Sequence, residues 1–375
     1  MNILVTGNMG YLGPWVVRQL RHSYPGAVMA GLDSGFFAHC LTDATIFPEC
    51  RVDIQYFADV RDLPAPALAG MDAIVYLAAI SNDPMGQKYE DVTLDVNYLA
   101  AARTARQAKQ AGARSFVYVS SCSVYGQAES GPRNEQSEVA PLTAYARSKA
   151  LAEQTLAGEA DERFQVTCLR FGTACGMSPR LRLDLVLNDF VACAVADRRI
   201  TVLSDGSPWR PLIHVKDMAR AIDWAISRKR DLSGAFLVVN AGTNEWNFQV
   251  KDLAEAVARA VPGTSCSINR DAPPDKRSYR VDFSLYQRLA PRHQPQQDLL
   301  ATIRELREGL EAMGFRDRNF RDSNFIRLKV LSRLCDLGYL TPELRWTEKT
   351  SGFPALAAAP DSETRSASVI CAPGA

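Results

Sequence analysis

The first thirteen residues, MNILVTGNMGYLG, constrain the fold of this chain more than any other stretch. The apolar run Ile3–Val5 predicts a buried strand, and three glycines, Gly7, Gly10 and Gly13, follow at intervals of three. Residues 14–20 then continue as an amphipathic helix. Glycine lets a backbone turn sharply and approach a ligand, and a helix start offers unpaired N–H groups to a pyrophosphate. The stretch predicts a strand–turn–helix unit that binds a dinucleotide, although its spacing differs from the commoner G-x-G-x-x-G.

A second apolar run, residues 27–32, predicts the next strand and ends at Asp33, 20 residues after Gly13. The three glycines alone also fit an ordinary tight turn without a ligand. An acid at the end of the second strand favours the dinucleotide, because its carboxylate can accept hydrogen bonds from the adenosine ribose. The same charge would repel a 2′-phosphate, so the sequence favours NAD over NADP.

The composition excludes several classes of partner. The 375 residues include 43 basic and 42 acidic side chains, so charge gives no case for nucleic acid or an anionic membrane. Nine cysteines are scattered without a C-x-x-C pair, which suits reduced thiols better than disulfides or a zinc site. The first strand begins at residue 2, which leaves no room for a signal peptide, and no apolar run could cross a bilayer. We expect a cytoplasmic protein with no bound metal, nucleic acid or membrane.

Strand and helix patterns alternate through the first 170 residues. Strands are expected at 55–62, 73–79, 115–119 and 165–170, with a helix over 92–111. This order predicts an α/β fold with a doubly wound parallel sheet, covered by helices on both faces. The third strand would bring Asp59 and Val60 to the adenine, although Asp59 could equally be an ordinary strand-end acid. The fourth ends in Leu77, Ala78 and Ala79, which are small enough for close contact with a cofactor.

The regular alternation of strand and helix patterns ends after residue 171. We expect an NAD-binding domain over 1–171, to which later strands return, and a smaller substrate-binding lobe over 172–295 with interleaved elements of the first domain. A helical extension is predicted over 296–349, with helices at 297–313 and 323–337. Residues 350–375 lack periodicity and predict a disordered tail.

The strongest chemical signal joins a serine-rich strand end to a helix start. Residues 120–126 read SSCSVYG, and Tyr145 and Lys149 in YARSK lie four apart on one predicted helix face. An ammonium beside a phenol favours the phenolate, so Tyr145 could take a proton from a hydroxyl that Ser121 holds. Y-x-x-x-K also occurs by chance on helices, but here it follows a dinucleotide turn in the same chain.

Together TGNMGYLG, Asp33, LAA, SSCSVYG and YARSK resemble the extended short-chain dehydrogenase/reductase family, the group of NAD-dependent nucleotide-sugar epimerases and dehydratases. The resemblance covers roughly residues 1–290 and implies a Rossmann sheet of about seven parallel strands. It also implies a nucleotide-sugar substrate and a homodimer formed through two helices per subunit. Tyr145 would be the base, Lys149 its partner, Ser121 the residue that holds the hydroxyl, and Asn97 a structural residue. Tyr11 and Leu12, in the glycine turn, are assigned to the cofactor.

The resemblance extends to the smaller lobe. The segment WRPLIHVKD matches a family motif in which arginine binds the nucleotide diphosphate, and this assigns Arg210. Arg280 resembles a second such arginine, with Arg277 as its alternative. His214 is expected to tie the segment down rather than to catalyse. Three further residues lie where the family binds diphosphate or sugar: Arg180, Arg182 and Asn188.

Some residues of this chain differ from the family's motifs, and these differences restrict the reactions that it can be expected to catalyse. The 4,6-dehydratases carry an Asp–Glu pair where this chain has Cys122 and Ser123, so dehydration is disfavoured. Cys122 is interpreted as a packed thiol, with a catalytic role as the alternative, and Ser123 is assigned to the substrate. Asp83 follows the fourth strand and fits either a second base or sugar contact, or an Asx-turn. The sequence predicts an epimerase that oxidises a sugar hydroxyl and returns the hydride. Its alternatives are a keto-sugar reductase or, less favoured, a dehydratase or a non-catalytic NAD sensor.

Overall fold

The computed structural model describes residues 1–42, 44–127, 131–269, 271–272 and 278–347. Two compact units are present, residues 1–330 and residues 331–375. Arg277 and the tail predicted over 350–375 lie outside the described residues. No helix in the described part of the chain is long and apolar enough to cross a membrane.

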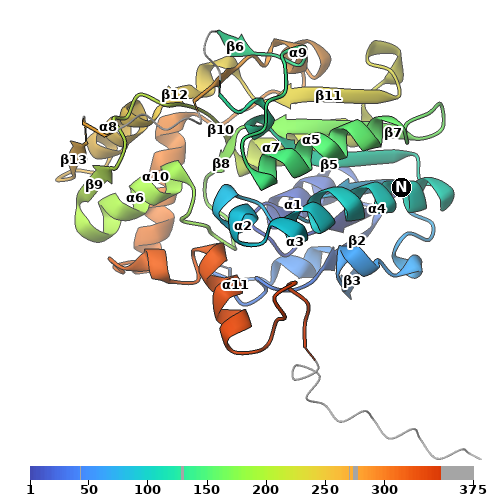
Figure 1. Cartoon of the computed structure of the whole chain (residues 1–375), viewed down its shortest axis with the longest axis horizontal. Helices are drawn as coiled ribbons and strands as arrows, with labels where there is room; N and C mark the ends of the chain where they lie inside the picture. The colour runs from blue at the N-terminus through green and yellow to red at the C-terminus, as the bar shows by residue number, and fades with distance from the viewer. Residues whose placement is uncertain (43, 128–130, 270, 273–277, 348–375) are drawn as a thin grey trace, which may run out of the picture. The chain divides into compact units, whose positions relative to one another are not determined.

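The first unit is built on a seven-stranded sheet in which every neighbouring pair is parallel, so the predicted fold class is confirmed (Figure 1). The order across the sheet is β11-β7-β5-β4-β1-β2-β3. The chain order reverses between β1 and β4, which is where open α/β sheets bind ligands at the carboxyl ends of their strands. The strands are β1 Asn2–Thr6, β2 Val28–Asp33, β3 Ile54–Phe57, β4 Ala73–Tyr76, β5 Ser115–Ser121, β7 Gln165–Phe171 and β11 Phe236–Ala241.

Helices cover both faces of this sheet because its strands are apolar on both sides. Ile3 and Val5 pack in one buried cluster with Val16 of α1 (Gly13–Ser23) and Ile222 of α7 (Val215–Ser227). Tyr76 of β4 lies outside this cluster and donates its hydroxyl to the Val96 carbonyl at 2.7 Å. The opposite face therefore carries the helices between β4 and β7, namely α2 Asp83–Lys88, α3 Glu90–Leu94, α4 Ala100–Gln110 and α5 Ala144–Ala157.

The helix predicted over 92–111 is interrupted. A π-helical turn, Asp95–Leu99, separates α3 from α4. It carries Asn97, whose side-chain amide is fully buried and hydrogen bonds both the N–H and the carbonyl of Ile80 at 2.9 Å. The turn thus fixes the backbone directly after β4, consistent with the structural role expected for Asn97.

Several predicted elements are shorter than expected. The third strand ends at Phe57, because Asp59 accepts a hydrogen bond from the N–H of Arg61 and begins a 3₁₀ turn over Val60–Asp62. The two C-terminal helices are α10 (Leu299–Ala312) and α11 (Arg327–Asp336), and the second begins four residues later than predicted.

The remaining elements of the first unit lie largely in the region predicted as the substrate lobe. Short strands pair as β10 with β8 and β12, β9 with β13, and β6 with β14. β11 lies within the same stretch of sequence but joins the main sheet beside β7 (Figure 1). Their bounds are β6 Pro132–Arg133, β8 Thr173–Cys175, β9 Arg199–Val202, β10 Trp209–His214, β12 Asn247–Gln249, β13 Ser265–Ile268, β14 Arg280–Val281, α6 Val186–Asp197, α8 Val250–Ala260 and α9 Ser284–Leu289.

Candidate active site

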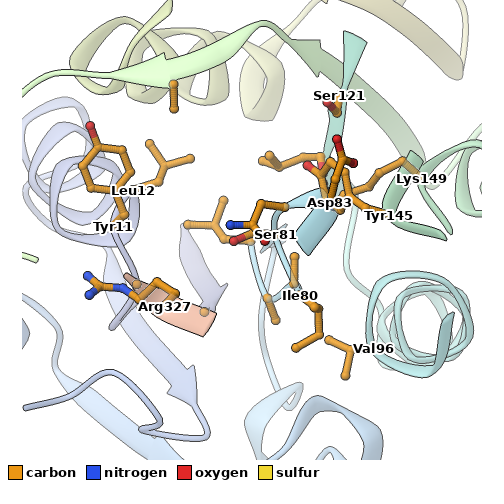
Figure 2. A pocket seen from close by; sticks show the side chains of 18 of the residues that line it. Tyr11, Leu12, Ile80, Ser81, Asp83, Val96, Ser121, Tyr145, Lys149 and Arg327 are labelled. Atoms are coloured by element: carbon orange, nitrogen blue, oxygen red, sulfur yellow. The ribbon is translucent and has the colours of Figure 1, made fainter. Parts of the chain in front are cut away.

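A cavity of about 610 Å³ opens at the carboxyl edge of the sheet, next to the reversal between β1 and β4. Figure 2 shows side chains from the glycine turn, from the segment after β4 and from α5 turned into it. Most residues that the sequence assigned to the site line this cavity: Gly7, Gly10, Tyr11, Leu12, Asp33, Asp59, Val60, Leu77, Ala78, Ala79, Asp83, Ser121, Ser123, Tyr145, Lys149, Arg182 and Arg210. Gly13, Asn188 and Arg280 are not among the lining residues.

The glycine turn fits a dinucleotide for steric reasons. Gly7 has a φ of +71°, and a Cβ there would stand 2.6 Å from the backbone nitrogen of Ala78. A Cβ on Gly13 would stand 2.0 Å from the carbonyl oxygen of Asn8, so this glycine serves packing within the turn instead of touching the cavity. Helix α1 begins without a side-chain cap, and the positive end of its dipole faces the glycine turn, where a ligand phosphate would be stabilised.

Asp33 is held at the end of β2 with a fixed orientation. Its carboxylate accepts hydrogen bonds from the backbone N–H groups of Met9, at 2.9 Å, and Gly35, at 2.7 Å. Desolvation raises the pKa of Asp33, and the two backbone bonds oppose that rise. The carboxylate lines the cavity beside the turn, where the ribose hydroxyls of a dinucleotide would lie.

Asp59 forms an ion pair with Arg61, a residue that the sequence did not indicate. The Arg61 guanidinium is almost fully buried and binds Asp59 through Nε at 3.0 Å and Nη2 at 2.7 Å. Arg61 and Val60 both line the cavity, with Val92 and Val96 from α3 and the π turn. This end of the cavity therefore combines a neutralised ion pair with apolar walls, which suits an adenine ring.

The reacting end is formed by β5 and α5. Thr143 caps α5 by accepting a hydrogen bond from the N–H of Ala146, and this places Tyr145 and Lys149 one turn apart on the cavity side. Burial raises the pKa of Tyr145 to about 12, and a hydrogen bond with Ser121 opposes the rise. Burial lowers the pKa of Lys149 to about 7. In the free protein desolvation therefore outweighs the stabilisation of the phenolate that the Tyr–Lys spacing predicted.

Behind Lys149 lies a buried ion pair. Glu153 binds Arg170 through Nη2 at 2.6 Å and also accepts a hydrogen bond from Ser120 at 2.5 Å. The Lys149 ammonium donates to the carbonyl of Val119 at 2.7 Å. These contacts join α5 to β5 and β7 and hold the lysine in place.

The part of the cavity beside Tyr145 is polar and suits a sugar. Arg182 forms two hydrogen bonds of 2.9 Å with Asp184 and donates a third to Ser81 at 2.8 Å. Asn82 donates to the same Asp184 at 2.9 Å. The buried hydroxyl oxygen of Ser123 has no hydrogen-bond partner among the described residues and so remains available to a ligand.

Two other candidates, Cys122 and His214, are fully buried outside the cavity lining. Cys122 is fully buried in a cluster with Tyr125 and Phe283, its thiol donates to the Arg170 carbonyl, and burial raises its pKa. The 3₁₀ turn Cys122–Tyr125 directs this thiol away from the cavity, which agrees with a packed thiol. His214 is fully buried and binds Glu305 of α10 at 2.7 Å.

The arginines and the amide outside the cavity also have identified partners. Arg180 binds Glu49 at 2.6 Å, and Arg280 lies over the Trp209 ring at 5.2 Å. The Asn188 amide donates to the hydroxyl of Tyr11 at 3.0 Å. Asn188 therefore connects α6 to the glycine turn, a contact between residues 177 positions apart.

One wall of the cavity was not indicated by the sequence at all. Ile326, Arg327 and Leu328, at the start of α11, line it together with Phe36 and Phe37. The Arg327 guanidinium is 1% exposed and donates to the carbonyls of Arg180 and Leu181 at 2.8 and 3.2 Å. No local pattern marks these residues, because their role depends on contacts about 146 positions away.

Residues 3–242 match the model of the NAD dependent epimerase/dehydratase family. The chain belongs to this family. It is an enzyme, and its cofactor is NAD. It is 28% identical to a dTDP-glucose 4,6-dehydratase of Streptomyces griseus over 312 residues, which cover 80% of this chain and 93% of the relative. It is 26% identical to an uncharacterized UDP-glucose epimerase of Bacillus subtilis over 268 residues, 69% of this chain and 82% of the relative.

Among solved structures, a UDP-glucose-4-epimerase from Stenotrophomonas maltophila with bound NAD and formylated UDP-arabinopyranose is similar. It superposes with a TM-score of 0.71 at 25% identity and covers 84% of this chain and 99% of its own. The family resemblance drawn from the sequence motifs is thus confirmed. Epimerases and dehydratases both occur among these epimerase/dehydratase relatives, so the family by itself leaves the reaction open.

Proposed function

We propose that this protein is an epimerase that acts on a nucleotide sugar by transient oxidation of one sugar hydroxyl. The observation that carries the proposal is the meeting of Ser121, Tyr145 and Lys149 in the cavity, with a buried thiol and a serine following Ser121. A dehydratase needs an acid to protonate the leaving hydroxyl, and neither Cys122 nor Ser123 supplies one. NAD supplies a hydride acceptor and donor at this site.

The chain's own residues handle the proton. In the proposed cycle the Tyr145 phenolate takes the proton of the sugar hydroxyl, and the Ser121 hydroxyl holds the same oxygen. The positive charge of Lys149 stabilises that phenolate once the cavity is filled. Tyr145 returns the proton when the ketone is reduced from the other face, so the cycle needs one proton carrier and no net change in the protein.

The nucleotide diphosphate is proposed to bind at the sugar end of the cavity. Arg210 lines the cavity there, and its planar guanidinium suits paired phosphate oxygens. The Ser123 hydroxyl, which has no partner within the described part of the chain, and the Arg182–Asp184 pair would hydrogen bond the sugar. Asn188 and Arg280 would contribute from outside the lining, Asn188 by positioning Tyr11.

A homodimer is part of the same proposal. Leu99, on the π turn, is 40% exposed, and Leu151, on α5, is 37% exposed. The π turn and α5 pack against each other. In a dimer, these two elements of one subunit would pack against the same two elements of the other and bury the leucines. Light scattering should then give twice the mass of one chain, and Leu151→Glu should shift the protein toward the monomer. A cytoplasmic location remains a prediction.

The experiment that tests the epimerase is a panel of nucleotide sugars followed by NMR with catalytic NAD. Inversion of one sugar carbon without net formation of NADH is the expected result, and Tyr145→Phe should reduce the rate by about 10²–10⁴. Stoichiometric use of NADH without inversion would instead support the keto-sugar reductase. A new carbon–carbon double bond or deoxy sugar would support a dehydratase.

A further inference from the structure

Two consecutive residues of β5 bind two consecutive turns of α5. The Val119 carbonyl accepts a hydrogen bond from the Lys149 ammonium at 2.7 Å, and the Ser120 hydroxyl donates to Oε1 of Glu153 at 2.5 Å. Lys149 and Glu153 are four residues apart in α5, so their Cβ atoms lie about 5–6 Å apart on one face of the helix. The lysine and the carboxylate are therefore neighbours between α5 and β5.

Glu153 is surrounded by donors that favour its ionised form. Its side chain is buried, and its two oxygens accept hydrogen bonds from Arg170 through Nε at 3.0 and 3.1 Å and through Nη2 at 2.6 Å. Hydrogen bonds to a carboxylate from a guanidinium and a hydroxyl stabilise its charge. Arg170 also donates to the Tyr125 hydroxyl at 3.0 Å. A fixed negative charge thus lies one helical turn from Lys149.

The other titratable groups near Lys149 are neutral phenols and thiols. Those that face it are Tyr145 on α5, Tyr118 on β5, with its ring 4.7 Å from the ammonium, and Cys168 on β7, while Asp83 on α2 and Cys122 after β5 act on Tyr145. Burial raises the pKa of Tyr118 and of Cys168 well above their usual values. Burial lowers the pKa of Lys149 to about 7, and the charge of Glu153 opposes this fall.

From this cluster we propose that Glu153 is a positioning residue for catalysis, which supplies the counter-charge that keeps the Lys149 ammonium protonated while Tyr145 acts. The proposal rests on the proposed function, in which a positive Lys149 stabilises the Tyr145 phenolate. Glu153 is not among the described residues that line the cavity, so it acts through Lys149. Without this carboxylate, the buried ammonium would lose its proton at a lower pH and the phenolate would lose its cation.

The test follows the charge of Lys149 directly. Full-length protein is labelled with carbon-13 at Cε of its lysines, loaded with NAD and titrated by NMR, and Lys149→Met identifies the signal. Glu153→Gln keeps the size of the side chain and removes its charge. The midpoint of the Lys149 titration should then fall by at least about 0.5 pH unit. The alkaline limb of the kcat/KM profile, measured on a nucleotide sugar that the protein inverts, should move to lower pH by a similar amount.

Ser120→Ala is the matched control. It removes another hydrogen bond of the same carboxylate but leaves the charge, so the titration and the alkaline limb should stay in place. Glu153→Gln also leaves the Arg170 guanidinium buried without its acid, which costs stability. The double variant Glu153→Gln/Arg170→Met removes both charges, and it should still lower the midpoint of Lys149. Circular dichroism compares the folding of all variants.

An unchanged Lys149 titration in both Glu153 variants would overturn the proposal. An equal fall in Ser120→Ala would also overturn it, because packing and not charge would then be responsible. So would a lowered titration with an alkaline limb that does not move, since the charge of Lys149 would not limit the reaction. The proposed function fails in a different way: if the titration falls as expected but no nucleotide sugar is inverted, the epimerase assignment is wrong and the effect of Glu153 on Lys149 stands.

Discussion

The Lys149 ammonium nitrogen lies 5.7 Å from the centroid of the Tyr145 ring at the reacting end of the cavity, where Lys149 is buried and Tyr145 is partly exposed. Burial lowers the pKa of Lys149 from 10.5 to about 7 and raises that of Tyr145 to about 12. Each shift disfavours the charged form of its group. In the folded protein the environment of Tyr145 and Lys149 therefore favours the neutral form of each side chain. Formation of the Tyr145 phenolate requires that Lys149 carry its positive charge.

The first prediction concerns the stability cost of this lysine. Between pH 7 and 10.5 the unfolded chain binds more protons at Lys149 than the folded protein, so the free energy of unfolding rises with pH over this window. Below pH 7 Lys149 is protonated in both the folded and the unfolded state, so the full free-energy cost of burying its charge is present. Lys149→Met should therefore melt at least about 2 °C above the wild type at pH 6, while losing activity.

The melting temperatures of the two proteins should approach each other at pH 9, where the wild-type lysine is mostly neutral. Lys109→Met is the control, because Lys109 pairs with Asp161 at the surface and should not show this pH dependence. If Lys149→Met melted below the wild type at pH 6, the buried lysine would be a net stabilising group and the interpretation would fail.

The second prediction concerns the choice of cofactor. Asp33→Ala removes a carboxylate that is oriented by the N–H groups of Met9 and Gly35. Loss of hydrogen bonds to a charged group costs about 1.5–3 kcal/mol, so NAD should bind about 10- to 100-fold more weakly. NADP should bind more tightly than before, because the repulsion of its 2′-phosphate is removed.

Titration of both cofactors against both proteins checks this. Asp53→Ala is the control, since Asp53 is an exposed acid at the opposite end of β2 that pairs with Arg21. An unmutated protein that binds NADP more tightly than NAD would contradict the role assigned to Asp33.

These predictions use residues whose roles follow from short stretches of sequence. The glycine turn, Asp33 and the Tyr145–Lys149 pair are each set by local spacing within one strand end or one helix. For this reason the sequence sufficed to predict the sheet, and most of the residues that it assigned to the site line the cavity. The same holds for Cys122, which the sequence predicted as a packed thiol and which is fully buried.

The parts that the sequence could not predict depend on contacts between distant segments. Asn82 meets Asp184 across 102 positions, and Gly86 is required only because α5 lies against α2. The π turn at Asn97 could not be predicted either, because the apolar pattern of residues 92–111 continues through it. Burial, which sets the pKa of Tyr145, is a property of the assembled site and has no signature in the Y-x-x-x-K motif.

The third prediction concerns the wall formed at the start of α11. Arg327 ties this segment to the carbonyls of Arg180, Leu181 and Asn324, so Arg327→Ala should loosen it. We expect NAD to dissociate at least about tenfold faster, because charged hydrogen bonds of this kind contribute about 1.5–3 kcal/mol. Stopped-flow release of NAD into excess competitor measures this rate.

Leu328→Ala provides a milder variant of the same wall and should also speed release. Arg316→Ala, at an exposed position that does not line the cavity, should not. Unchanged release in both wall variants, with normal circular dichroism, would show that α11 does not retain the cofactor.

The fourth prediction separates two ways of inverting a sugar carbon. The described cavity lining places no carboxylic acid at the positions directly after Ser121, where Cys122 and Ser123 stand. The simplest mechanism is removal of the carbon-bound hydrogen as hydride, rotation of the keto sugar, and return of the same hydrogen to the opposite face. That hydrogen never exchanges with water. Epimerisation in heavy water should therefore give a product without carbon-bound deuterium, as measured by NMR and mass spectrometry.

Enolisation is the competing mechanism, and it would leave deuterium at the inverted carbon. It requires a base that faces the carbon, and Asp83 is the cavity carboxylate beside Tyr145. Asp83→Asn should therefore abolish an enolising reaction, whereas a hydride mechanism should retain most of its maximal rate in this variant. A deuterated product together with an inactive Asp83→Asn protein would assign Asp83 as the carbon base and reject the hydride mechanism. A deuterium-free product from both proteins would leave Tyr145 as the proton carrier, because hydride return requires no base at carbon.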